Sequence, residues 1–263
     1  MTSCEIRIHL YAYVRLGGRH YWDWGQKDIS VPYWRIYWNC VGGAFIHTRL
    51  GKLELTPDEI ILLPPHTEYS TYARSEVGHF YAHFSADRPF SQMPPHVFRL
   101  GSAPLLSQAS SLAQEVAMDR ESVRAQLKVE IYVRSALLCL PEKEVPRLSL
   151  RDSRVQRALS ILAKRTTVSN TELAEAVGMS RNGFLNLFRQ EAGMAPQAYS
   201  RRRRLEEASV QLHFSESPIS AIAEAAGFSD RYHFTKAFKC QFGIGPGEYR
   251  RRFISPNKGH GNC

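Results

Sequence analysis

The stretch LAEAVGMSRNGFLNLFRQEAGMAPQAYSRR, residues 173–202, returns in altered form as IAEAAGFSDRYHFTKAFKCQFGIGPGEYRRR, residues 222–252. Gly178 lies 49 positions before Gly227, and Phe188 lies 50 positions before Phe238. The offset changes by one residue between these pairs, at a turn where an insertion costs little. An internal repeat of this kind indicates one supersecondary unit used twice. Each copy predicts a short helix, a glycine turn and a second helix rich in cations, which is the pattern of a helix-turn-helix.

The charge of the chain is concentrated in the half that contains the repeat. Residues 1–150 hold 16 Lys and Arg against 15 Asp and Glu, whereas residues 151–263 hold 18 against 10. This asymmetry predicts that the second half binds a polyanion, and the repeated motif favours double-stranded DNA. No apolar run is long enough to cross a bilayer, and the first residues lack the basic, apolar and small-residue segments of a signal peptide. We therefore expect a cytoplasmic protein with no membrane partner. The five cysteines are scattered, which predicts reduced thiols and no zinc site.

The hydrophobic pattern divides the chain into two domains of an α+β protein. Residues 5–100 predict short strands broken by glycine and proline turns, which is typical of a barrel or sandwich. Residues 102–118 and 122–140 predict two amphipathic helices, whose apolar faces either cover the strands or pair with a second subunit. We expect an N-terminal domain at 1–140, a proline-bounded linker at 141–150, an all-α domain at 151–255 and a flexible tail at 256–263.

The second helix of each repeat has an inner and an outer face. Phenylalanines at spacings of three and four, such as Phe184 and Phe188 or Phe234 and Phe238, must point inward. The opposite faces carry amides and cations, which suit adenine edges, guanine edges and phosphates. The outer residues are Arg181, Asn182, Leu185, Asn186 and Arg189 in the first copy, and Arg231, Tyr232, Thr235, Lys236 and Lys239 in the second. A recognition helix of this kind enters the major groove by its N-terminal residues.

The second copy resembles the signature of the AraC/XylS family of bacterial transcription regulators. The resemblance rests on SPISAIAEAAGFSDRYHFTKAFKCQFGIGPGEYRR, with Gly227, Phe228, Phe238, Pro246 and Tyr249 at the family's fixed positions. It covers residues 152–253 and implies tandem helix-turn-helix motifs one DNA turn apart. By this resemblance the base contacts come from Asn182, Leu185, Asn186, Arg231, Tyr232, Thr235 and Lys236. Gly183 departs from the family pattern, since larger residues are frequent there, and it predicts a less rigid first helix.

The phosphate contacts are expected from helix starts and from arginines outside the recognition faces. The arginine run 201–204 opens the helix that connects the two motifs, and Arg250 follows Tyr249 near the end of the second motif. Such cations are better placed for the DNA backbone than for bases. We expect phosphate contacts from Ser180, Arg181, Arg189, Arg201, Arg202, Ser229, Lys239 and Arg250.

The N-terminal half resembles the cupin-like sensor domain of sugar-responsive members of the same family. The run LTPDEIILLPPHTEYSTYARSEVGHFYAHF carries this weaker resemblance, which implies a β-barrel that binds a small effector and a homodimer formed through the helices near 102–140. This half is rich in aromatic and imidazole side chains, which suit the CH faces and hydroxyls of a carbohydrate. The candidate effector residues are Arg35, Trp38, Tyr69, His79, Tyr81 and His83. Arg35 could instead anchor an anionic effector or lie outside the site, and each histidine could be an ordinary core residue.

A catalytic metal is not expected in this half. His79 and His83 are four residues apart, which on a strand separates them by roughly 13 Å. The sequence therefore predicts a non-enzymatic, cofactor-free transcription regulator, an activator by family resemblance, with RNA polymerase as a further candidate partner. Two alternatives stay open: a cupin-type sugar-processing enzyme with a basic interaction domain, and a DNA-binding regulator without ligand control.

Overall fold

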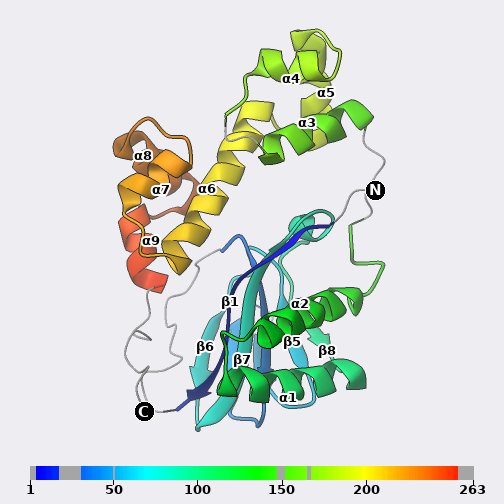
Figure 1. Cartoon of the computed structure of the whole chain (residues 1–263), viewed down its shortest axis with the longest axis vertical. Coiled ribbons are helices and arrows are strands. Elements are labelled where there is room, and N and C mark those ends of the chain that lie inside the picture. The colour runs from blue at the N-terminus through cyan, green and yellow to red at the C-terminus, as the bar shows by residue number, and fades with distance from the viewer. Residues whose placement is uncertain (1–3, 18–30, 50, 147–151, 165–166, 254–263) are drawn as a thin grey trace. The chain divides into compact units, whose positions relative to one another are not determined.

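The computed structural model describes residues 4–17, 31–49, 51–146, 152–164 and 167–253. The chain divides into two compact units, residues 1–147 and 148–263 (Figure 1). The predicted tail at 256–263 and the last four residues of the predicted linker, 147–150, lie outside the described residues. None of the helices in the described part of the chain is long and apolar enough to cross a membrane.

The first unit contains two antiparallel sheets. A five-stranded sheet has the order β1-β7-β2-β5-β8, and a three-stranded sheet has the order β4-β3-β6. The strands are β1 Ile6–Leu16, β2 Trp34–Asn39, β3 Ala44–Thr48, β4 Gly51–Leu55, β5 Ile60–Leu63, β6 Ser70–Ala73, β7 Val77–Ala86 and β8 Phe98–Leu100. The described strands form no closed barrel, because neither edge strand of the small sheet pairs with an edge strand of the large one. The expectation of a barrel is therefore replaced by two facing sheets.

One face of the large sheet is covered by two helices, α1 Ala103–Met118 and α2 Val123–Leu138 (Figure 1). Their buried positions repeat at helical spacing, and they pack on the side chains that point from alternate positions of β2 and β7. Phe80, Ala82 and Phe84 supply the β7 part of this core. The opposite face of the large sheet packs against the small sheet, with Ala44, Ile46 and Leu55 in the second core. The strand periodicity of two thus gives β7 a core on both sides.

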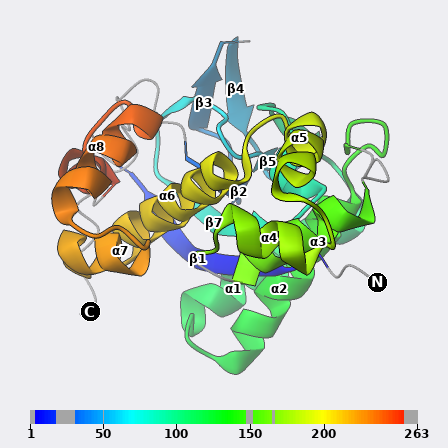
Figure 2. The same ribbon diagram turned by 90° about the horizontal axis from the view of Figure 1, so that it is seen from above.

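The second unit is helical throughout its described residues. A long helix, α6, connects two groups of shorter helices, α3 to α5 on one side and α7 to α9 on the other (Figures 1 and 2). The bounds are α3 Ser153–Lys164, α4 Asn170–Ala176, α5 Arg181–Ala192, α6 Pro196–Phe214, α7 Ile219–Ala225, α8 Arg231–Phe242 and α9 Pro246–Phe253. The two copies of the sequence repeat are α4–α5 and α7–α8, each followed by a helix that begins with proline, α6 or α9.

Helix starts and turns follow the sequence with one correction. The side chain of Ser169 accepts from the backbone of Glu172, whose carboxylate accepts in return from the backbone of Ser169, so α4 begins at Asn170. The order Thr171-Glu172 in the sequence predicts instead a cap at Thr171, two residues later. The glycines that follow α4 and α7, Gly178 and Gly227, have φ angles of 68° and 71°. These left-handed conformations favour glycine and let each motif turn sharply into its second helix.

Candidate functional site

Helix α5 presents a polar outer face over a buried phenylalanine pair. Phe184 and Phe188 are 0% exposed and lie in the core of the first motif. Arg181, Asn182, Asn186 and Arg189 are exposed on the other side of the helix. Leu185, which the sequence placed with this outer set, is half-buried against the core of the motif. Leu185 therefore offers a base only its apolar edge.

Helix α8 presents the corresponding face of the second motif. Arg231, Tyr232, Lys236 and Lys239 are exposed, and Tyr232 is 73% exposed although it is a large aromatic. The hydroxyl of Thr235 donates a hydrogen bond of 2.8 Å to the carbonyl of Arg231 within the helix. Thr235 is thus half-buried and keeps its methyl group and hydroxyl oxygen at the edge of the face.

The two recognition helices start with different caps. In α5, Oγ of Ser180 accepts a hydrogen bond from the backbone N–H of Gly183 at 3.3 Å. In α8, a carboxylate oxygen of Asp230 accepts from the backbone N–H of His233 at 2.8 Å, and this bond lowers the pKa of Asp230. The Ser229 hydroxyl donates to Asp230 at 3.3 Å. The expected phosphate position at Ser229 therefore lies beside a carboxylate, which repels phosphate, whereas the position at Ser180 has a neutral cap.

The four arginines at 201–204 do not share one role. Arg201 and Arg202 are exposed, and Arg202 pairs with Glu206 one turn away at 2.9 Å. Arg203 and Arg204 instead donate to backbone carbonyls within the unit. The reason is helical geometry: successive side chains leave α6 about 100° apart, so four in a row cannot all face one ligand.

Arg250, an expected phosphate contact, has a hydrogen-bond partner within the unit. Its guanidinium donates to the carbonyl of Ser217 at 2.6 Å, and the side chain is half-buried. This bond ties α9 to the residue just before the second motif. Arg250 therefore has a structural contact in this chain, and its phosphate contact stays a prediction.

In the first unit, five of the six candidate effector residues belong to one polar cluster. We use this name for Arg35, Tyr37, Asn39, Tyr69, His79, Tyr81 and His83. Cross-strand register between β2 and β7 pairs Arg35 with His83, Tyr37 with Tyr81 and Asn39 with His79 on the same face of the sheet. Tyr69 lies just before β6 of the small sheet, and its ring centroid is 6.2 Å from that of Tyr37.

Hydrogen bonds and burial fix the polar cluster. Arg35 is 6% exposed, donates to the carbonyl of Thr67 at 2.7 Å and lies 4.3 Å from the ring centroid of Tyr69. The hydroxyls of Tyr37 and Tyr69 are hydrogen-bonded to each other. His79 Nδ1 is 2.7 Å from Asn39 Oδ1, and burial lowers the pKa of His79 to about 3. His79 is therefore neutral near pH 7 and can exchange hydrogen bonds without a charge.

Trp38 does not belong to the polar cluster. It pairs with Phe80 on the helix-covered face of β2, and its indole N–H donates to the carbonyl of Pro57 at 3.1 Å. Trp38 was predicted to share a site with Arg35, but two residues three positions apart on a strand point to opposite faces. The same rule would have identified Tyr37 and Asn39, which lie two and four positions from Arg35 and were missed. Thr67 gave no sequence signal, because it contacts Arg35 through its backbone.

Metal chemistry has no candidate site in the described part of the chain, where no group of three or more His, Cys, Asp or Glu side chains comes together. The four cysteines in the described part of the chain form no disulfide with one another.

Residues 173–252 match the model of the helix-turn-helix domain. A transcriptional activator from Escherichia coli, RclR, is 37% identical over 98 residues, which are 37% of this chain and 34% of that protein. The arabinose operon regulatory protein of Escherichia coli is 28% identical over 102 residues, 38% of this chain and 35% of that protein. The chain therefore carries a helix-turn-helix domain, which we call the AraC-type domain because it resembles that of the arabinose operon regulatory protein. The matches span about a third of these two relatives, so they concern the AraC-type domain and not the first unit.

A solved structure shows the same fold over nearly the whole chain. ToxT from Vibrio cholerae has a TM-score of 0.51 at 14% sequence identity, and the match covers 96% of this chain and 98% of ToxT. The likeness therefore extends from the AraC-type domain to the two-sheet unit. At this identity it shows a shared fold only.

Proposed function

We propose that the chain is a sequence-specific DNA-binding transcription regulator, in which α5 and α8 contact two successive stretches of major groove. The observation that carries the proposal is the repeated construction of the two motifs, each with a buried phenylalanine pair inside and exposed cations or amides outside. The expected base contacts are Asn182, Asn186, Arg231, Tyr232 and Lys236, with lesser contacts from Leu185 and Thr235. The expected phosphate contacts are Ser180, Arg181, Arg189, Arg201, Arg202 and Lys239.

Salt-dependent binding tests the DNA proposal. Duplexes selected by the full chain from a random library would be titrated by fluorescence anisotropy between about 50 and 200 mM salt, against a scrambled duplex as control. Phosphate neutralisation releases counterions, so we expect affinity for the selected duplex to fall roughly 10³- to 10⁵-fold over this range if six to ten phosphates are contacted. Equal affinity for selected and scrambled duplexes would reject sequence-specific binding.

We also propose that a small effector, a carbohydrate, binds at the polar cluster of the first unit. Guanidinium, phenol, amide and imidazole groups lie beside aromatic rings on one sheet face, and this mixture suits a ring with many hydroxyls. ToxT, which shares the fold, has been solved with an unsaturated fatty acid bound. The mixture of aromatic rings and polar groups in the polar cluster matches a polyhydroxyl ligand better than an acyl chain, so we propose a sugar for this chain.

Thermal shift of the full chain tests the effector proposal. A panel of neutral sugars and sugar acids would be compared with fatty acids of equal concentration, since a ligand that prefers the native state raises Tm. We expect a sugar to raise Tm in the wild type and not in Tyr81→Ala, whereas His47→Ala, an exposed change outside the polar cluster, keeps the shift. A shift from fatty acids alone would assign a different ligand class.

We propose a homodimer through the outer face of α2. Val123, Leu127, Ile131 and Leu138 are 70%, 55%, 58% and 83% exposed, and their spacings of four, four and seven place them along one side of the helix. An exposed apolar stripe of this kind is typical of a subunit interface. Leu127→Glu with Ile131→Glu should convert a dimer to a monomer in analytical ultracentrifugation, while Arg124→Glu on the same helix should not. A wild-type monomer at micromolar concentration would reject the dimer.

Activation and contact with RNA polymerase complete the proposal. An effector changes output only if it binds two arrangements of the protein with different affinity. In vitro transcription from a promoter that contains the selected site, with and without the sugar, measures this effect. We expect more transcript in the presence of the protein and its effector; less transcript would make the protein a repressor.

A further inference from the structure

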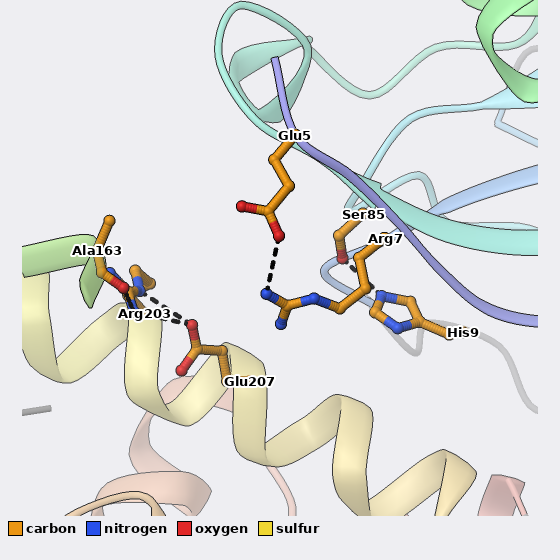
Figure 3. A network of polar contacts seen from close by, with 7 residues as sticks. All are labelled: Glu5, Arg7, His9, Ser85, Ala163, Arg203 and Glu207. Atoms are coloured by element: carbon orange, nitrogen blue, oxygen red, sulfur yellow. Dashed lines mark hydrogen bonds and ion pairs between the residues drawn. The ribbon is translucent and has the colours of Figure 1, made fainter. Parts of the chain in front are cut away.

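Two neighbouring arginines of α6 bind the two halves of the AraC-type domain separately. Arg203 donates to the carbonyl of Leu162 and, at 2.7 Å, to the carbonyl of Ala163, both in the last turn of α3 (Figure 3). Its Nε also donates to Glu207 at 3.0 Å, which holds the guanidinium in place from one turn further along α6. Helix α3 packs on α4 and α5, so Arg203 connects α6 to the first motif.

Arg204 makes the equivalent contact with the second motif. It donates to the carbonyls of Ala226 and Gly227 at 2.7 and 3.0 Å, at the turn between α7 and α8. Its guanidinium also lies 5.2 Å from the ring centroid of Phe228, which in turn contacts Phe234 of the buried pair. Arg204 therefore binds the turn that sets the direction in which α8 leaves α7.

The chemistry of helix ends explains why arginine occupies both positions. The last carbonyls of a helix have no intrahelical donor, and they carry the negative end of the helix dipole. A guanidinium carries several donors and a positive charge, so one side chain can bind two adjacent carbonyls. Arg203 does so through its two terminal nitrogens, which form a planar fork, whereas Arg204 binds both carbonyls through Nη1 alone. Leu205, Ala208 and Leu212 of α6 are also buried, but apolar packing is not directional.

We propose that Arg203 and Arg204 are positioning residues that set the orientation of α5 relative to α8, so that both helices can engage one DNA site together. The proposal rests on the proposed DNA-binding function. Neither side chain needs to touch DNA, because each acts by fixing one motif on the shared helix. The gain in affinity from linking two DNA-binding motifs is lost when the geometry forbids simultaneous binding. Orientation should therefore control affinity for a composite site much more than affinity for half of it.

The test compares composite and half sites. The full-length wild type, Arg203→Met, Arg204→Met and the control Arg201→Met would be titrated with the selected duplex, with each half alone, and with the halves moved apart by one base pair. For Arg203→Met and Arg204→Met we expect the advantage of the composite site over the better half site to fall about tenfold or more. We expect affinity for the half sites to change less than about threefold and the one-base-pair insertion to be tolerated better. Arg201 is exposed and should change composite and half sites in parallel.

A positioning role, a general loss of stability and an absence of DNA binding each give a different result. A general loss of stability would lower composite and half-site affinity together, and that outcome, like an unchanged ratio, would overturn the positioning role. If Arg203→Met does not fold, Arg203→Lys replaces it, because lysine keeps the charge but lacks the planar fork with which Arg203 binds two carbonyls. If Arg204→Met does not fold, the shorter and uncharged Arg204→Gln replaces it, because Arg204 binds both carbonyls through one nitrogen, which a lysine could replace. A wild type with no specific DNA binding would reject the proposed function itself, whereas specific wild-type binding with unaltered variant ratios rejects only this inference.

Discussion

The two helix-turn-helix motifs of this chain share one internal construction and differ on their outer faces. Inside, Phe184 and Phe188 correspond to Phe234 and Phe238, and all four are 0% exposed. Each recognition helix has 12 residues and ends at a left-handed glycine, with φ of 74° in the first motif and 77° in the second. Outside, the first motif shows two asparagines where the second shows a tyrosine and a lysine. Packing constrains the interior of both copies, while the exposed faces remain free to read different bases.

The caps extend this difference. The first recognition helix begins with a neutral serine and the second with an aspartate whose pKa is lowered. The first helix also contains Gly183 where the second has His233. The second recognition helix is therefore more cationic along its outer face and more acidic at its N-terminus than the first. This distribution suits base contacts along the helix more than a phosphate contact at the N-terminus.

The largest expected effect tests whether the interiors are equivalent. Phe184→Ala and Phe234→Ala should each destabilise the chain by about 3–5 kcal/mol, because each removes a fully buried ring and leaves a cavity. Urea unfolding measures both, with Tyr232→Ala as the exposed control that should stay near the wild type. A cost below about 1 kcal/mol at either phenylalanine would break the equivalence of the two interiors.

A smaller effect tests whether the outer faces read different bases. Arg231→Ala or Lys236→Ala should weaken specific binding by ~1–3 kcal/mol if the side chain contacts a base. Asn186→Ala should act in the same range but on base pairs at the other half of the site. Binding to duplexes with single base changes assigns each residue to a position. If all three variants lose the same preference, or none does, the motifs do not read separate sequences.

The caps predict a pH dependence confined to the second motif. The backbone N–H of His233 donates to Asp230 and holds the pKa of that carboxyl below its ordinary value of 3.8. The stability that Asp230 contributes is therefore present above the ordinary pKa and is lost as the pH falls through the lowered one. In unfolding curves measured between about pH 6 and pH 2, Asp230→Ser should reduce the fall in the free energy of unfolding on acidification. Ser180→Asp should increase that fall, because it places a second titrating cap at the start of α5. Parallel pH profiles for the wild type and Asp230→Ser would contradict the assignment.

The smallest expected effect concerns Gly183. Gly183→Ala should stabilise the chain by roughly 0.5 kcal/mol, less than the full gain of about 1 kcal/mol for alanine over glycine in a helix. A Cβ at this position would lie 3.0 Å from Ser180 Oγ, so the capping side chain must shift. In a Ser180→Ala background the same change should give the full gain, because the hindrance is gone. Equal gains in both backgrounds, measured by urea unfolding, would show that the cap is not affected.

Sequence periodicity predicted the parts of this protein that depend on local pattern. The repeat, the buried phenylalanines, the helices at 102–118 and 122–140 and the grouping of His79, Tyr81 and His83 on one strand face follow from periods of 3.6 and 2. The α4 cap at Ser169 was missed because Thr171 and Glu172 formed an equally plausible start in sequence. Trp38 was grouped with Arg35 by residue type, although strand alternation places the two side chains on opposite faces of β2.

Other features depend on contacts that the sequence does not encode locally. Arg203 and Arg204 bind carbonyls more than 20 residues away, and the same run of four arginines also contains two exposed cations. Composition alone could not separate these roles. Whether strands close into a barrel depends on pairing between edge strands that are distant in the sequence. Here the edge strands of the small sheet, β4 and β6, do not pair with the large sheet.

Hydroxyl-radical footprinting of the full chain on its selected duplex tests the central claim most directly, because it shows how many stretches of DNA are covered at once. If α5 and α8 engage one site together, two protected regions should appear with centres about one helical turn, or 10–10.5 base pairs, apart. Protection of a single region that disappears on Arg231→Ala and is unaffected by Asn186→Ala would contradict the claim that both motifs bind.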